Sequence, residues 1–86
     1  MDARYLDLAE RIKKAEFRTT RFSPGYDERE VDDLLDRVVD ILRDSDLPDP
    51  QELRDAQFTT RRLRPSYVMK DVDDLLQEIA EAAARM

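Results

Sequence analysis

The sequence repeats itself within a chain of 86 residues. Residues 17–35 read FRTTRFSPGYDEREVDDLL and residues 58–76 read FTTRRLRPSYVMKDVDDLL, at a constant offset of 41 positions. Ten of the nineteen aligned residues are identical. A duplication over most of a short chain restricts the fold to one that two similar units can build together.

Length and composition exclude several classes of protein. A chain this short buries only about 60% of its unfolded surface, so we expect one domain in which the repeats share a core. The absence of histidine and cysteine removes the commonest general base and metal ligand and any disulfide framework. A net charge of −6 argues against a nucleic-acid partner. Neither a signal peptide nor a membrane-spanning apolar run is present, so we expect a cytoplasmic protein.

Apolar residues at helical spacing predict the same plan in each repeat, a short helix, a loop and a long helix. The predicted helices cover residues 2–15, 27–44, 50–56 and a last segment through Val72 almost to Met86. The loops, 17–26 and 58–67, show no strand-like alternation. We therefore predict an all-α single domain, with repeat 1 at 1–44, repeat 2 at 50–86 and a linker at 45–49.

Local signals refine this plan. Asp27 followed by Glu30 predicts a capping box at the start of the first long helix. Gly25, the only glycine, follows Pro24, which predicts a turn with a positive φ. Four aromatic residues are expected to belong to the core and hold each loop to a helix: Phe17, Tyr26, Phe58 and Tyr67.

Each long helix carries an apolar stripe that it cannot bury alone. Packing the two stripes together predicts a short coiled coil, with the two long helices parallel if the repeats are related by a two-fold axis. The linker is long enough for the chain to fold as a pseudo-dimer of itself. A true homo-oligomer satisfies the same pattern, and the sequence leaves this choice open.

The string GYDEREVDDLLD, preceded by Phe17 and followed by an apolar heptad, resembles the N-terminal domain of the DivIVA family, which includes the cell-division regulator GpsB. Repeat 2 matches at Phe58, Tyr67 and Val72 but has Ser66 in place of the glycine. The chain looks most like the actinobacterial proteins with repeated DivIVA motifs. The resemblance implies a short helix, a crossed loop and a parallel coiled coil, in a scaffold for bacterial division or polar growth. The long coiled-coil extension of that family is not present here.

The first candidate surface is the pair of loops, which contain arginines and no acid. The resemblance implies that an apolar residue and an arginine in the loop contact anionic lipid at the inner face of the membrane. The membrane-contact candidates are Arg18, Arg21, Phe22, Arg61, Arg62, Leu63 and Arg64. The alternative places Phe22 and Leu63 in the core and pairs the arginines with nearby acids.

The second candidate surface is acidic. The resemblance implies a groove at Tyr26, Asp32 and Asp36 that takes an arginine from the cytoplasmic tail of a division protein. The i, i+4 spacing puts both carboxylates on one helix face, where they can hold a guanidinium. Repeat 2 has Gln77 in place of Asp36. The alternatives are solvated carboxylates with Tyr26 in the core, or bonds from Asp32 and Asp73 to the loop arginines.

These observations predict a non-catalytic scaffold with no cofactor and no metal site. The acidic pairs lack the spacing of calcium ligands, and the chain has no nucleophile–base pair. Two further hypotheses stay open. One is a soluble adaptor that uses only the acidic groove, and the other is a degenerate structural module.

Overall fold

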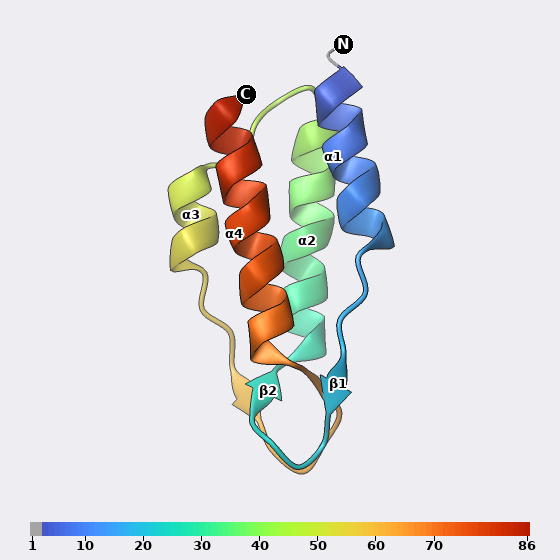
Figure 1. The fold of residues 1–86 in the computed structure, drawn as a ribbon, viewed down its shortest axis with the longest axis vertical. Coiled ribbons are helices and arrows are strands. Elements are labelled where there is room, and N and C mark those ends of the chain that lie inside the picture. Colours follow the sequence, from blue (N-terminus) through green and yellow to red (C-terminus); the bar gives the residue numbers. More distant parts are fainter. Residues whose placement is uncertain (1–2) are drawn as a thin grey trace.

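The computed structural model describes residues 3–86, which are 61% helical and also form four very short strands (Figure 1). The elements in chain order are α1 (Ala3–Lys14), β1 (Thr19–Thr20), β2 (Gly25–Tyr26), α2 (Glu28–Arg43), α3 (Pro50–Asp55), β3 (Thr60–Arg61), β4 (Ser66–Tyr67) and α4 (Met69–Arg85). All four predicted helices are present. The described ends of α1, α2 and α3 lie within one residue of the predicted ones, and α4 ends at Arg85, close to Met86 as predicted. The predicted start at Asp2 lies outside the described residues.

The ends of α2 follow from local hydrogen bonds. The Asp27 carboxylate caps the helix by accepting from the Glu30 amide at 3.1 Å. The predicted capping box is half formed, because the Glu30 carboxylate accepts instead from the amide of Thr59 in repeat 2. At the other end the chain turns through Ser45, which has φ 59°. The amides of Ser45 and Asp46 close the last turn onto α2 carbonyls, the pattern of a Schellman cap.

The helices pack first within each repeat, α1 against α2 and α3 against α4. In Figure 1 the long helices α2 and α4 run in the same direction and each short helix runs back along its own partner. Both described chain ends lie at the end of the molecule opposite to the loops. The whole measures 44 × 22 × 16 Å.

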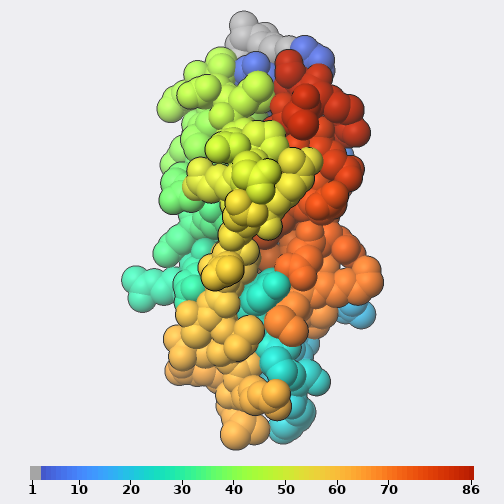
Figure 2. Space-filling view, turned by 90° about the vertical axis from the view of Figure 1, so that its left-hand side faces the viewer, coloured from blue at the N-terminus to red at the C-terminus, as the bar shows by residue number. Residues whose placement is uncertain are grey.

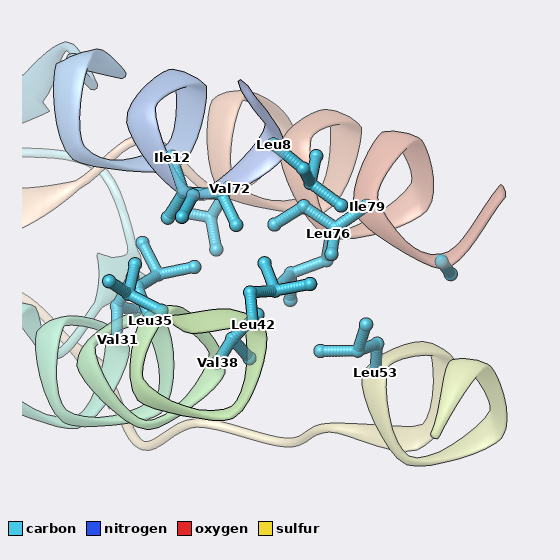
Figure 3. Packing of buried hydrophobic residues seen from close by; sticks show 13 residues of the cluster. Leu8, Ile12, Val31, Leu35, Val38, Leu42, Leu53, Val72, Leu76 and Ile79 are labelled. Carbon is cyan, nitrogen blue, oxygen red and sulfur yellow. The ribbon is translucent and has the colours of Figure 1, made fainter. Parts of the chain in front are cut away.

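All four helices contribute to one core (Figure 3). Its central side chains, Val31, Val38, Leu42, Val72 and Ile79, are at most 1% exposed, and burying each contributes about 1.5–3 kcal/mol. Leu8 and Ile12 of α1 and Leu53 of α3 point into the same cluster. The parallel direction of the long helices agrees with the prediction, but a separate two-stranded coiled coil is not seen.

The prediction of a purely helical chain is wrong, because the two loops form a four-stranded antiparallel sheet in the order β1-β4-β2-β3. Every pairing joins one repeat to the other. At its centre Tyr26 pairs with Tyr67. Each strand has only two residues, too few to leave an alternating pattern in the sequence.

The predicted positive φ at Gly25 is also wrong, since no described glycine has one. Glycine is required at position 25 because there is no room for a side chain. A Cβ there would lie 2.4 Å from the Ser66 hydroxyl and 2.7 Å from the Tyr67 carbonyl oxygen. Ser66 occupies the equivalent place in repeat 2 and is fully buried. The crossing point of the loops therefore holds one side chain, not two.

We expect Gly25→Ser to lower the free energy of unfolding by about 1–3 kcal/mol, the range for overpacking a filled site. Urea denaturation measures this. Adding Ser66→Gly removes the nearest clashing atoms and should restore part of the loss, although the Tyr67 carbonyl remains close. Ser66→Gly alone is the matched control. Additive effects of the two substitutions would contradict a shared crossing point.

Candidate functional site

The strands hold the two loops together as one narrow end of the molecule, called here the loop tip (residues 21–24 and 62–65). Thr20 pairs with Ser66 on one side and Gly25 with Arg61 on the other. Beyond these pairs the Leu63 amide donates to the Arg21 carbonyl at 2.9 Å, which ties one loop to the other. In Figure 2 atoms of both repeats lie side by side at this end.

The loop tip carries two exposed apolar side chains. Phe22 is 85% and Leu63 is 82% exposed, far more than Leu6 at 41%, the third large exposed apolar residue among those described. The alternative that placed Phe22 and Leu63 in the core is therefore wrong. They occupy equivalent positions in the two repeats, and the crossing of the loops brings both to the same end.

Two of the predicted membrane-contact arginines have structural partners instead. The Arg18 guanidinium makes a bidentate pair with Asp71, at 2.8 and 3.0 Å. Arg61 pairs with Asp27 at 3.1 Å. Both ion pairs join repeat 1 to repeat 2, so these arginines help to hold the crossed loops. The Arg18 pairing lowers the pKa of Asp71 to about 2.

The other three loop arginines, Arg21, Arg62 and Arg64, are exposed and make no ion pair with any described residue. No acidic residue lies in either segment of the loop tip. The tip therefore combines uncompensated positive charge with the two most exposed large apolar side chains of residues 3–86.

The predicted groove residues do not come together as expected. Tyr26 donates its hydroxyl to Asp73 of repeat 2 at 2.7 Å, and Tyr67 donates to Asp32 of repeat 1 at 2.8 Å. Partial burial and these carboxylates raise the pKa of each tyrosine to about 12, so both stay protonated donors at neutral pH.

The aromatic rings also pack across the repeats, Phe17 on Tyr67 and Tyr26 on Phe58. All four aromatic side chains are half-buried against the core, in partial agreement with the prediction.

Asp32 and Asp36 line a groove of about 570 Å³ between α1 and α2, and Tyr67 is a further lining residue. Its other charged side chains are Glu16 and Lys13. The groove is therefore lined by three carboxylates and one ammonium group. The equivalent groove of repeat 2, about 230 Å³, is lined by one carboxylate, Asp73, and one guanidinium, Arg54, with Gln77 beside them. Of these two equivalent grooves, only that of repeat 1 has an excess of negative charge.

Tyr67, and not Tyr26 as predicted, is the tyrosine of the repeat 1 groove. The resemblance assigned Tyr26 to this groove, because the tyrosine and the aspartates lie in one continuous string of the motif. The crossed loop that the resemblance implied was the available signal, since crossing sends each tyrosine to the other repeat. For the same reason Asp32 and Asp73 bond tyrosines rather than loop arginines.

Within residues 3–86 no helix has the length and apolar character needed to cross a membrane. The same residues contain no cluster of acidic side chains arranged to hold a metal ion. Comparison with models of protein families, with curated proteins and with solved structures gave no match.

The Asp71 pairing predicts an acid-sensitive contribution to stability. Because the folded-state pKa of about 2 lies below the ordinary 3.8, the contribution is complete above about pH 4 and disappears as the pH falls through 2. The stability difference between wild type and Asp71→Asn should therefore shrink across this window. Urea midpoints at several pH values measure it, with Asp33→Asn as control. A difference that is independent of pH would exclude this linkage.

Proposed function

We propose that this chain is a non-catalytic, DivIVA-like scaffold that binds the anionic inner surface of a bacterial membrane through its loop tip, in cell division or polar growth. The family assignment rests on the repeated motif and is supported by the crossed loops and the parallel long helices. In this proposal α2 and α4 correspond to the parallel coiled coil of that family.

One observation supports the membrane surface above all others. The two most exposed large apolar residues of the described chain, Phe22 and Leu63, share one end of the molecule with Arg21, Arg62 and Arg64. An apolar pair surrounded by unpaired arginines complements an interface of acyl chains beneath anionic headgroups. Neither side chain contributes to the core, so packing within the fold does not account for an apolar residue at either position.

The expected affinity is modest. A basic residue near an anionic leaflet contributes about 1 kcal/mol, and inserting a large apolar side chain contributes at least about 1.5 kcal/mol. Three arginines and two apolar side chains then provide roughly 6 kcal/mol, a dissociation constant of tens of micromolar. Both loops belong to one chain, so this affinity does not require self-association.

A second candidate function is supported by the charge of the repeat 1 groove. Asp32, Asp36 and Glu16 line a hollow beside the aromatic rings of Phe17 and Tyr67. A guanidinium suits this setting, because it pairs with carboxylates and stacks on aromatic faces. The corresponding partner is an arginine-containing cytoplasmic tail of a division protein. The two functions are compatible, since the groove lies on the helices and not on the loop tip.

We expect the double variant Phe22→Ser, Leu63→Ser to lose co-sedimentation with anionic vesicles while keeping the wild-type circular dichroism. Wild-type binding should weaken with salt, since the arginine contribution is screened. Leu6→Ser is the matched control, because it removes an exposed leucine from α1 and should bind as wild type. Equal binding of wild type and the double variant would refute the membrane surface.

For the groove we expect Asp36→Asn to weaken binding of an arginine-containing peptide about tenfold, the effect of losing one charge-assisted bond. Calorimetry with the isolated peptide measures this without lipid. Asp40→Asn removes an exposed acid of the same helix outside the groove and should have little effect. If Asp36→Asn and Asp40→Asn weaken binding equally, the peptide responds to net charge and the groove hypothesis fails.

A further inference from the structure

Two ion pairs join each short helix to the long helix of the other repeat. Arg11 of α1 pairs with Glu78 of α4, and Glu52 of α3 pairs with Arg37 of α2 at 2.5 Å. At the offset of 41 positions, Arg11 is equivalent to Glu52. Arg37 is equivalent to Glu78 in the same way. The two ion pairs therefore occupy the same place in the pseudo-symmetric fold, with the signs of their charges exchanged.

This exchange of sign distinguishes an unlike pair of repeats from a like pair. Repeat 1 contributes an arginine at both positions, and repeat 2 contributes a glutamate at both. Two copies of repeat 1 in this arrangement would place Arg11 of each copy against Arg37 of the other. Two copies of repeat 2 would place Glu52 against Glu78. Like charges in such contacts repel about as strongly as opposite charges attract, so both like pairs are disfavoured.

The crossing of the loops disfavours like pairs as well. Gly25 meets Ser66 there, and a Cβ at position 25 would lie 2.4 Å from the Ser66 hydroxyl. Two copies of repeat 2 would bring two serines to this point. The pair between Arg61 and Asp27, at 3.1 Å, is lost in either like pair, because the position equivalent to each residue is uncharged.

Other contacts between the loops do not distinguish the repeats. Each tyrosine hydroxyl donates to an aspartate of the other repeat, and each phenylalanine ring packs on a tyrosine of the other repeat. The residue types are the same in both directions, so a like pair would make these contacts too. Selectivity between the repeats therefore depends on the charged pairs and on the crossing point.

We infer that the surface between the repeats is selective for an unlike repeat. Repeat 1 binds repeat 2, of its own chain or of a second copy, and does not bind another repeat 1. A second copy then joins only by exchanging repeats, which preserves every charged pair. The four side chains of the two equivalent ion pairs are at least 40% exposed, so they add little to stability. Their main effect is on the choice of partner, and it does not depend on the proposed membrane function.

The test compares three full-length proteins of identical composition and net charge. All three carry Ser66→Gly, which removes the steric part of the selectivity. The first has the wild-type charges. The second exchanges one pair, Arg37→Glu with Glu52→Arg, so that like repeats become complementary while the chain's own repeats stay complementary. The third adds Arg11→Glu with Glu78→Arg, which restores the repulsion between like repeats.

Each protein is refolded from urea at about millimolar concentration, where a second copy competes with the linked repeat. Analytical ultracentrifugation then measures the dimer. The second protein should dimerise about 100-fold more strongly than the first and third, because four contacts of a like-paired dimer change from repulsion to attraction at roughly threefold each. Returning the serine at position 66 to the second protein should lower its dimerisation.

Equal dimerisation of the three proteins at low salt would overturn the inference, and so would a third protein that dimerises like the second. Exchange of repeats between chains keeps the unlike contacts in all three proteins, so it contributes equally to each and does not produce the expected order. The first protein gives an independent measurement. High salt screens the like-charge repulsion and should raise its dimer fraction, and a dimer fraction independent of salt would also overturn the inference.

Discussion

The close crossing of the two loops is the constraint on which the rest of the structure depends. Gly25 and Ser66 meet at this point, and only one of the two positions has room for a side chain. The crossing exchanges partners between the repeats. Phe17 then packs on Tyr67 and Tyr26 on Phe58, each on a ring of the other repeat. The hydroxyls of the two tyrosines each reach an aspartate of the other repeat's long helix. The sheet, the ion pairs and the loop tip all follow from this exchange.

The two repeats make equivalent contacts with different residues. The backbone amide of Arg18 donates to Asp71, and the amide of its counterpart, Thr59, donates to Glu30. The Arg18 and Arg61 ion pairs have no counterpart of the same kind, since each equivalent position has a threonine. Repeat 1 and repeat 2 have thus become complementary halves. The repeats also differ at the loop tip and in the two grooves, the places where contact with another molecule is proposed.

Charge is separated along the molecule. The chain has a net charge of −6, yet the loop tip contains arginines without acids, while the groove of repeat 1 concentrates carboxylates on the helices. An anionic surface attracts the tip and repels the helices, which favours an end-on approach. A cationic peptide is attracted instead to the groove between α1 and α2. One small fold therefore presents two surfaces that suit partners of opposite charge.

The sequence by itself determined the duplication, the four helices, the Asp27 cap of α2 and the absence of acidic residues from the loops, because these features depend on near neighbours and on composition. It also grouped Asp32 with Asp36, since helical spacing places them on one face. Only the tertiary structure decided the short strands, the need for Gly25, the choice of Tyr67 over Tyr26 beside Asp32 and the exposure of Phe22 and Leu63. These depend on contacts between residues far apart in the chain. The crossing of the loops creates those contacts, and no local pattern encodes them.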